Sequence, residues 1–392
     1  MALDVAAVQA ALRQDGLDGW LLYDFHGSNP IARAVAGVNG RQMTTRRWYC
    51  LIPAEGPPRK LVHAIEPGTL DHLPGETLRY AGHEALASGL DALLAGMRRV
   101  AMEYSPGNAI PYIARVDAGT IEAVRQRGVE VVSSGDLVQR FEACWSPDAL
   151  ETHRTASAAL YRVKDRAFAA IADAVRGGTP ITEYDIQQQM IGWMQAEGLT
   201  SSDPPVVAAM ENAGNPHYQP TAQRNRRIGR DELVLLDLWG RLPQPGAVYA
   251  DITWVGFTGT QVPPEQEAAF AAVVGARDAA LALVQDAVRS GREIRGWEVD
   301  RAARTVLIER GYGAHVLHRT GHSLGQEVHG NGVHMDDYET HDDRRLLPGT
   351  GFTIEPGLYF PEFGVRTEIN VYVDHDDARV TGPMQQQIVA LG

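Results

Sequence analysis

One pattern occurs twice in the chain: AFAAIADAVRGGTPITEYDIQQQMIGWMQAEGL at residues 167–199 and ALALVQDAVRSGREIRGWEVDRAARTVLIERGY at residues 280–312. The two copies align without a gap at one constant offset, which places Ala167 opposite Ala280 and Gly198 opposite Gly311. Each copy has the periodicity of a helix, a tight turn at glycine and a second helix. Because self-similarity at a fixed offset marks a duplicated structural unit, the pattern predicts two pseudo-symmetric halves.

Both copies are followed by the same succession of segments, a histidine-bearing stretch and then two β-like runs that each contain an acid. The first copy is followed by His217, by ELVLLDLWG with Asp237 and by VYADITWVGF with Asp251. The second is followed by His322, by GFTIEPGLYF with Glu355 and by GVRTEINVYV with Glu368. The acids therefore belong to the repeat. We expect the strands of both halves to form one sheet with the helices behind it, and the four acids to converge on the symmetry axis.

The acids stand in apolar surroundings. Asp237 ends the run 233–236, which is apolar on both faces and predicts a buried strand. A carboxylate there is costly unless it is paired or binds a metal, although a strand-end aspartate can also cap the next turn. Glu355 lies in another apolar run, and Pro356 favours an extended backbone before it. Four acids at matched positions argue against a merely solvated strand face.

Histidines concentrate in the second half of the chain. Six of the 13 fall in the short stretch 315–341: His315, His318, His322, His329, His334 and His341. In LHRTGHSLGQEVHG, Gly321 and Gly325 allow close approach of the backbone. Neutral imidazole together with carboxylates suits a divalent metal such as Mn, Co or Zn. Four carboxylates and a histidine exceed the needs of one catalytic zinc, which favours two metals that share carboxylates.

The residues before the repeat predict a separate domain. Short β-rich runs such as GWLLYDF and RVAMEY alternate there with helix-like stretches, including 85–97 and 111–128, as in an α/β domain. Ser146 followed by Pro147 is typical of the start of a helix, and a long helical pattern follows. We therefore expect an α/β domain over residues 1–147 and an α+β domain with the internal duplication over residues 148–392.

Composition excludes several classes of protein. With 36 basic and 49 acidic residues the formal net charge is −13, which opposes binding to nucleic acid or to an anionic membrane. No apolar run approaches the ~20 residues of a membrane span. The opening stretch 1–16, with Asp4, predicts an amphipathic helix instead of a secretory signal. Cys50 and Cys144 are too few for a disulfide framework, although a single bridge stays open. These features predict a cytoplasmic protein.

The acidic and histidine segments together resemble one family. LLDLW, YADITW, TGHSLGQEVH, TIEPGLY and VRTEINVYV resemble, in order and spacing, the five metal-ligand segments of the pita-bread metallopeptidases. That family includes methionine aminopeptidase, aminopeptidase P, prolidase and creatinase, and the resemblance covers residues 150–392. A preceding α/β domain of about this size resembles the branch of aminopeptidase P, prolidase and creatinase. The family's pita-bread fold would explain the duplication.

The resemblance implies a role for each metal-binding position. Asp237 resembles the carboxylate that binds one metal ion, and Asp251 and Glu368 resemble the pair that bridges both ions. His322 and Glu355 resemble the ligands that complete the second site. Glu355 also resembles the residue that carries a proton during hydrolysis. Two divalent ions are therefore expected, most readily manganese, with cobalt or zinc as alternatives.

Other positions resemble residues that contact the substrate. His217, in NPHYQP, His318 and His329 match histidines that contact the peptide and stabilise the tetrahedral intermediate. Arg366 resembles an arginine that orients the metal ligands.

Peptidases of this branch hydrolyse the peptide bond before a proline. Prolidases cleave Xaa-Pro dipeptides, whereas aminopeptidase P takes longer peptides, and this sequence resembles a prolidase more. A dipeptidase needs a cation for the terminal carboxylate. Arg344 and Arg345 are candidates, although a solvated loop that balances the neighbouring acids explains them at least equally well. His341 stands where some prolidases have the arginine that binds this carboxylate, and it is a further candidate for that role. Creatinase-like C–N hydrolysis or a non-catalytic binding module are more distant alternatives, because both would be expected to lose the carboxylates.

The resemblance also implies partners. We expect an Xaa-Pro peptide substrate, no nucleic acid and no membrane. A homodimer is expected, in which the first domain serves oligomerisation and restricts the substrate, and in which the region of Asp24 or His26 reaches a neighbour's active site.

Overall fold

The computed structural model describes residues 3–38 and 43–392, and the chain divides into two compact units, Met1–Glu142 and Ala143–Gly392. The division comes slightly before the boundary expected after Pro147. Trp145 explains the difference, because it is already bound within the second unit. Its backbone N–H donates to the Gly349 carbonyl at 2.7 Å, and its indole N–H donates to the Leu324 carbonyl at 3.1 Å.

The first unit is built on one mixed six-stranded sheet with the order β4-β3-β2-β1-β5-β6. Its strands are β1 Gly19–Asp24, β2 Trp48–Pro53, β3 Arg59–His63, β4 Glu76–Tyr80, β5 Arg99–Met102 and β6 Glu130–Ser133. Its helical segments are α1 Val5–Gln14, α2 Pro30–Val35, α3 His83–Leu93, η1 Pro106–Asn108, α4 Ala118–Arg125, α5 Gly135–Val138 and η2 Gln139–Ala143. The expected α/β architecture is confirmed.

Helices cover both faces of this sheet. Alternate residues of β1 enter two separate apolar clusters: Trp20 packs with residues of α1 and α2, whereas Leu21 packs with residues of α3 and α4. The helix expected over 111–128 begins only at Ala118, because the Asp117 side chain accepts the Thr120 N–H and caps it there.

The second unit contains the duplicated helix pairs, and its helices are α6 Pro147–Gly177, α7 Glu183–Ala196, α8 Pro264–Ser290 and α9 Gly296–Glu309. As predicted, Ser146 caps α6, with its side chain accepting the Ala149 N–H. Gly178 and Gly291 end α6 and α8 at matched positions, both in the left-handed region with φ of 70°. Across residues 3–38 and 43–392, no helix has both the length and the apolar character needed to cross a membrane.

Strands of the second unit form two four-stranded sheets and a hairpin. One sheet has the order β16-β9-β8-β7 and contains β7 Val206–Ala209, β8 Leu233–Gly240, β9 Ala250–Phe257 and β16 Val389–Ala390. The other has the order β10-β11-β14-β15 and contains β10 Ser323–Leu324, β11 Gly351–Ile354, β14 Ile369–Val373 and β15 Ala378–Val380. The hairpin joins β12 Gly357–Tyr359 to β13 Gly364–Arg366, and short turns lie at η3 Met210–Gly214 and η4 Gly313–His315.

The expectation of one continuous sheet is therefore wrong for the described residues. The two sheets are separated beside β9, because the strand is interrupted at Glu368, between β13 and β14. A hydrogen bond from the Glu368 N–H to the Thr253 carbonyl, at 3.3 Å, joins the two sheets there. The Asn370 side chain also bonds the backbone N–H of Asp251, at 3.0 Å, and its carbonyl. Side chains thus replace part of the ladder where the acids meet.

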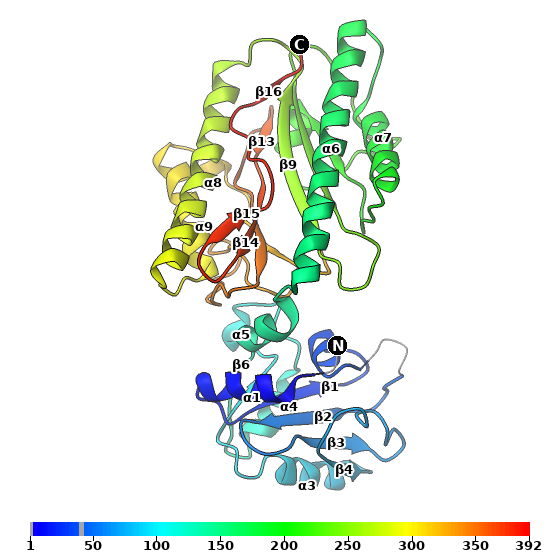
Figure 1. Ribbon diagram of the computed structural model, residues 1–392, viewed down its shortest axis with the longest axis vertical. Coiled ribbons are helices and arrows are strands. Elements are labelled where there is room, and N and C mark those ends of the chain that lie inside the picture. Colours follow the sequence, from blue (N-terminus) through cyan, green and yellow to red (C-terminus); the bar gives the residue numbers. More distant parts are fainter. Residues whose placement is uncertain (1–2, 39–42) are drawn as a thin grey trace. The chain divides into compact units, whose positions relative to one another are not determined.

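The helix pairs cover the sheets of the second unit. Figure 1 shows the long helices α6 and α8 on either side of β9. Phe168 of α6 belongs to a buried cluster with Leu236, whereas Phe270 of α8 belongs to a second cluster with Phe352. Burial of each such side chain contributes roughly 1.5–3 kcal/mol to folding. Two apolar layers therefore support the strands that hold the acids.

Candidate metal centre

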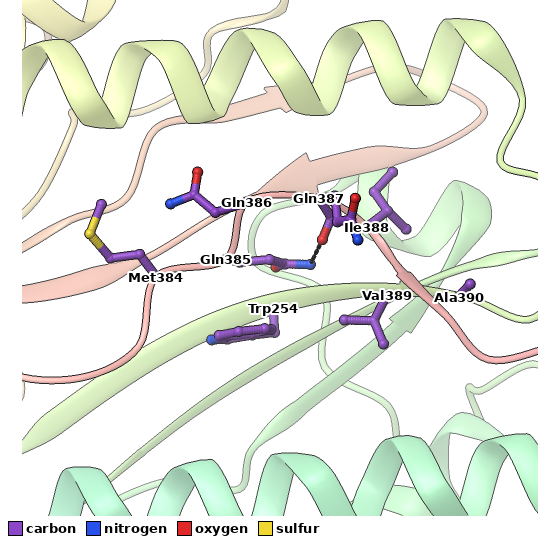
Figure 2. Close-up of a pocket in the computed structure, with 8 residues that line it drawn as sticks. All are labelled: Trp254, Met384, Gln385, Gln386, Gln387, Ile388, Val389 and Ala390. Carbon is purple, nitrogen blue, oxygen red and sulfur yellow. Dashed lines mark hydrogen bonds between the residues drawn. The ribbon is translucent and has the colours of Figure 1, made fainter.

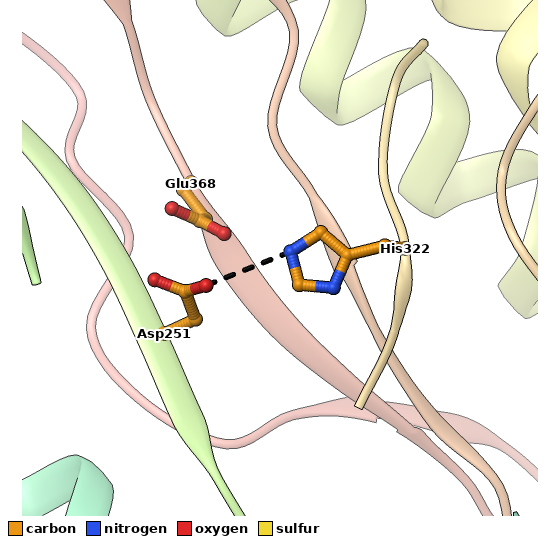
Figure 3. A group of neighbouring side chains, drawn as sticks. All are labelled: Asp251, His322 and Glu368. Carbon is orange, nitrogen blue, oxygen red and sulfur yellow. Dashed lines mark ion pairs between the residues drawn. The ribbon is translucent and has the colours of Figure 1, made fainter. Parts of the chain in front are cut away.

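Three side chains from distant parts of the sequence meet in the interior of the second unit. Figure 3 shows Asp251 on β9, His322 just before β10 and Glu368 just before β14 pointing toward one another. Each offers a ligand atom within 4.8 Å of those of the other two. All three are buried, with 2–5% of their surface exposed. The His322 Nε2 atom lies 3.5 Å from Asp251 Oδ2. Such a group could hold a metal ion.

Two oxygens of this group have no hydrogen-bond donor among the described residues. Asp251 Oδ1 and Glu368 Oε1 are both buried and unpartnered, whereas Glu368 Oε2 accepts from the Thr253 hydroxyl at 2.8 Å. A buried acceptor without a partner costs about 1–3 kcal/mol, and more when it is charged. Two such oxygens beside an imidazole fit a divalent cation, which would satisfy both.

The electrostatics point the same way. Burial raises the pKa of Asp251 well above its usual value, and the charges of Asp237 and Glu355 raise it further. Burial also raises the pKa of Glu368 well above its usual value, and Asp251 is the next largest cause. The cluster therefore favours bound positive charge, either protons or a cation.

Arg366 connects the remaining two acids to this group. Its guanidinium is paired with Asp237 on β8, and its Nε lies 3.8 Å from Glu355 Oε2. Glu355 Oε1 in turn lies 3.3 Å from His322 Nε2. Contacts thus link all five residues predicted to bind metal. Arg366 also donates from Nη1 to the Tyr359 hydroxyl at 3.1 Å, so it fixes its neighbours from inside the site.

Backbone contacts hold the His322 segment against β11. The His322 N–H donates to the Thr353 hydroxyl at 3.0 Å, and the Thr353 N–H donates to the His322 carbonyl at 2.8 Å. A Cβ atom at Gly321 would lie 2.0 Å from the Thr353 carbonyl oxygen, so this approach requires glycine. The Glu355 N–H donates to the Thr320 carbonyl at 2.6 Å. Two of the predicted ligands are therefore fixed relative to each other by short backbone hydrogen bonds.

The structure separates the three histidines predicted to contact substrate. His318 is tied at both ring nitrogens, Nδ1 at 2.6 Å from the Arg319 carbonyl and Nε2 at 2.6 Å from the Tyr359 hydroxyl. Burial lowers the pKa of His318, which favours the neutral form of its imidazole. The ring centroid of His329 lies 4.2 Å from that of His322. The charge of His322, followed by burial, lowers the pKa of His329 to about 3.

His217 has a different environment. It is exposed after η3, where its backbone N–H donates to Asn215 Oδ1 at 3.0 Å. Among the described residues no hydrogen bond or ion pair joins its imidazole to the cluster.

The residues considered for binding a substrate carboxylate are engaged elsewhere. Arg344 does not lie in a solvated loop: it is buried, its Nε and Nη2 donate to Asp342 at 2.9 and 2.6 Å, and its Nη1 donates to the Asn331 carbonyl at 2.8 Å.

The neighbours of Arg344 have surface partners. His341 Nδ1 lies 2.6 Å from Asp337 Oδ1, and its exposed ring stacks on Trp297. Arg345 Nη1 lies 3.8 Å from Glu293. Within the described residues, no ion pair or hydrogen bond brings Arg344 or His341 to the metal cluster.

Sequence reasoning assigned no role to several polar residues that complete the site. Thr253 bonds Glu368 and Arg366, and Asn370 bonds the backbone at Asp251. Their signal was their spacing: each stands two residues after an acid, hence on the same face of its strand. Tyr359, by contrast, lies in an apolar run and had no such signal.

A separate hollow of about 610 Å³ lies on the other side of β9. Trp254 and residues 384–390 line it, as Figure 2 shows. Because side chains alternate along a strand, Trp254 faces away from the side that carries Asp251 and Thr253. Gln385 closes the inner wall by bonding the Val255 carbonyl at 2.6 Å and its N–H at 2.9 Å. This hollow is therefore distinct from the metal cluster.

Comparison with known proteins agrees with this geometry. The model of metallopeptidase family M24 matches residues 152–375, the part that holds every residue of the cluster. The chain belongs to this family. Among curated M24 relatives, the probable dipeptidase PepE of Mycobacterium tuberculosis (strain ATCC 25618 / H37Rv) is 30% identical over 254 residues, which cover 64% of this chain and 61% of the relative. The Xaa-Pro dipeptidase of Lactobacillus helveticus is 31% identical over 235 residues, covering 59% and 58%. The matches thus span less than two thirds of these relatives.

Solved structures extend the likeness to the whole chain. The dipeptidase PepE from Mycobacterium ulcerans superposes with a TM-score of 0.69 at 23% identity, covering 99% of this chain and 96% of the other. The prolidase from Thermococcus sibiricus gives a TM-score of 0.64 at 21% identity, covering 98% of both chains. The pita-bread fold predicted for the second unit is confirmed.

Proposed function

We propose that this M24 protein is a dinuclear metal-dependent peptidase that hydrolyses Xaa-Pro bonds, chiefly in dipeptides. The observation that carries the proposal is the pair of unpartnered, buried oxygens on Asp251 and Glu368 beside His322. Relatives named dipeptidase and Xaa-Pro dipeptidase support the choice of substrate. All five residues expected to bind metal, four acids and one histidine, are present. A creatinase-like or non-catalytic protein would be expected to have lost some of them.

In this proposal Asp237 would hold one ion, His322 and Glu355 would hold the other, and Asp251 and Glu368 would serve both. When bound, the ions would polarise the scissile carbonyl and acidify a water molecule. Carboxylate oxygens outnumber imidazole in this set, which suits manganese, with cobalt and zinc as alternatives.

The protein's own residues bind the peptide and move the proton. Glu355 accepts a proton at its carboxylate from the attacking water and passes it to the proline nitrogen that leaves. His329, neutral at working pH, donates an N–H to the oxyanion that develops on the carbonyl. His318 uses both nitrogens within the protein and so shapes the wall of the site through Tyr359. His217, on its exposed turn, contacts the substrate.

One observation favours aminopeptidase P as a second candidate. A dipeptidase needs a cation for the terminal carboxylate, and the Arg344 guanidinium is already bound to Asp342 and the Asn331 carbonyl. If no other cation closes the pocket, longer peptides fit as well.

Hydrolysis of Ala-Pro and of Ala-Pro-Ala, with Mn²⁺ and after chelation, tests both candidates. Cleavage of Ala-Pro alone supports the dipeptidase, and cleavage of both peptides moves the assignment to aminopeptidase P. Glu368→Gln should lose Mn²⁺-dependent cleavage of both peptides. Its control, Glu309→Gln at an exposed acid on α9, should keep full activity. Metal-independent cleavage, or none of either peptide, contradicts the proposal.

The first unit would serve dimer formation and restrict the substrate, as part of the same proposal. Asp24 is buried and accepts the backbone N–H groups of Gly27 and Asn29, at 3.2 and 3.0 Å. These bonds present the exposed His26, whose φ is 56°, in a fixed turn. We propose a cytoplasmic homodimer in which this turn reaches the neighbour's site. Sedimentation equilibrium that shows only monomer contradicts it.

A further inference from the structure

A buried acid at the start of α7 gathers donors from one long segment. Glu183 has no exposed surface, and its carboxylate accepts from the Ala209 N–H at 2.7 Å, the Arg226 N–H at 2.9 Å and the Tyr218 hydroxyl at 2.5 Å. The Asn212 amide also donates to both oxygens at 3.0 Å. All four donors lie in residues 209–226, the segment that carries His217 on its exposed turn.

A second buried acid, in the other half of the duplication, also accepts hydrogen bonds from a histidine-bearing segment. Asp300 on α9 is 1% exposed, and Oδ1 accepts from the Thr320 N–H at 2.9 Å and the Thr320 hydroxyl at 2.6 Å. Its Oδ2 accepts from the Asp337 N–H at 2.9 Å. Both donor residues bracket the segment with His322 and His329. The Thr320 carbonyl moreover accepts the Glu355 N–H. Two successive hydrogen bonds through Thr320 therefore connect Asp300 to Glu355, which is predicted to bind metal together with His322.

Glu183 and Asp300 each hold a histidine-bearing segment, but they stand at different positions of the repeat. In the gap-free alignment of the two copies, Glu183 stands opposite Gly296, and Asp300 stands opposite Gln187. The acid therefore shifts by four residues, which leaves it on the same helix face one turn further on. In the second half a Cβ at Gly296 would lie 2.0 Å from the His334 carbonyl oxygen. The histidine segment itself thus fills the space that the Glu183 side chain takes in the first half.

We propose that Glu183 and Asp300 are the positioning residues of the two histidine segments, Glu183 for the segment of His217 and Asp300 for that of His322. Through the Thr320 carbonyl, Asp300 also positions Glu355. A carboxylate suits this task because it only accepts hydrogen bonds, and all the groups that face it are donors. An amide of the same shape turns one end into a donor, which leaves N–H groups of the segment unpaired. The consequences for activity, though not those for segment order, rest on the proposed function.

The two acids should fail in different ways. Loss of the Asp300 anchor loosens residues that include two predicted metal ligands, so Asp300→Asn should lower the affinity for Mn²⁺ about 10- to 100-fold. Loss of the Glu183 anchor loosens only a segment that contacts substrate. Glu183→Gln should therefore leave the Mn²⁺ affinity unchanged and lower kcat/KM about 10- to 100-fold, mainly through KM.

Hydrogen–deuterium exchange, Mn²⁺ titration calorimetry and peptide kinetics on the full chain test the proposal. We expect faster exchange in residues 209–226 for Glu183→Gln and in residues 318–337 for Asp300→Asn, with the rest of the second unit unchanged. Glu211→Gln is the control for the first variant, because Glu211 lies in the same segment but is exposed, and among the described residues its side chain pairs with that of Arg226 alone. Glu309→Gln on α9 is the control for the second.

The outcomes separate this proposal from the proposed function. If the wild-type protein cleaves no Xaa-Pro peptide, the proposed function fails, while exchange and Mn²⁺ affinity still decide the role of the two acids. Variants that match their controls in exchange, with unchanged Mn²⁺ affinity in Asp300→Asn, overturn the proposal. If either amide variant does not fold, Glu183→Asp and Asp300→Glu keep the charge. Faster exchange confined to the named segments then supports the proposal, and any other exchange pattern overturns it.

Discussion

Buried carboxylates occur in both units, and they differ in how their oxygens are satisfied. In the first unit Glu103 accepts from the Trp20 indole at 2.8 Å, the Asn29 amide at 2.8 Å and the Ser134 hydroxyl at 3.1 Å. In the second unit Asp251 Oδ1 and Glu368 Oε1 are equally buried and have no donor among the described residues. Burial raises the pKa at all three positions. Burial and a raised pKa therefore do not identify a functional acid.

Glu103 differs from Asp251 and Glu368 in whether neutral donors satisfy its carboxylate oxygens. Three neutral donors satisfy both oxygens of Glu103, so it holds its sheet to its loops without a cation. Asp251 and Glu368 instead face each other and His322, and the described residues supply no donor to Asp251 Oδ1 or Glu368 Oε1. A protein can retain such a cluster when a bound cation offsets its cost. The comparison predicts opposite consequences when the two kinds of acid are removed.

The largest effect is expected at the shared ligands. Glu368→Ala should reduce Xaa-Pro hydrolysis by at least about 10³-fold and deplete bound Mn²⁺, because this residue is proposed to bind both ions. The metal-free variant should be no less stable than the metal-free wild type, since the change removes a buried carboxyl group whose Oε1 has no donor among the described residues. Metal content after dialysis, turnover and melting temperature measure these effects. Retained metal with near-normal turnover would show that the shared ligand is wrongly assigned.

His329 should separate catalysis from metal binding. His329→Ala should keep its Mn²⁺ and lose turnover by roughly 10²–10³-fold, as expected for an oxyanion donor. Metal analysis beside initial rates gives the answer. Depleted metal would instead make His329 a ligand and extend the cluster.

Glu103 should show the reverse pattern. Glu103→Ala leaves three buried donors unpaired and should lower the free energy of unfolding by about 3 kcal/mol. The Mn²⁺ content and the turnover of the folded protein should stay unchanged. Urea unfolding monitored by circular dichroism measures the first effect. Loss of Mn²⁺ from the folded variant would erase the distinction between the two kinds of acid.

A smaller effect concerns pH. The pKa values of Asp251 and Glu368 are higher in the folded, metal-free protein than in the unfolded chain, where they are about 4. Protonation of these two acids therefore stabilises the metal-free fold, and this contribution is complete when the pH is below about 4. That contribution is lost as the pH rises through the raised folded values. Mn²⁺ replaces the protons, so the stabilisation by Mn²⁺ should grow with pH, by up to about 1.4 kcal/mol per unit for each proton displaced. Melting temperatures with and without Mn²⁺ across pH 5–8 test this, and a constant difference contradicts it.

Much of the second unit could be predicted because its signals are local and repeated. The glycines that end α6 and α8, the Ser146 cap and the strands that carry Asp237 and Asp251 follow from periodicity and capping. The close approach at Gly321 was also predictable. Apart from the approach of Gly321 to Thr353, these features depend on neighbours within a few residues, and the duplication gave a second copy of the glycine ends and of the acid-bearing strands.

Other features depend on contacts that the sequence does not encode locally. Arg344 resembles a loop charge, yet it is buried, and its Nη1 donates to the carbonyl of Asn331, 13 residues earlier in the chain. Glu183 follows a capping threonine and so resembles a first-turn surface acid, although its partners lie up to 43 residues further on. The split into two sheets likewise depends on how Asn370 meets β9, which only the tertiary packing determines.

The most direct test of the metal assignment is a Mn²⁺ titration of the chelator-treated wild-type protein, with Ala-Pro hydrolysis followed at each addition. We expect two ions to bind per chain, hydrolysis to be absent after chelation, and hydrolysis to return as the ions bind. A protein that takes up no divalent ion, or that hydrolyses the peptide equally well after chelation, would contradict the metal assignment.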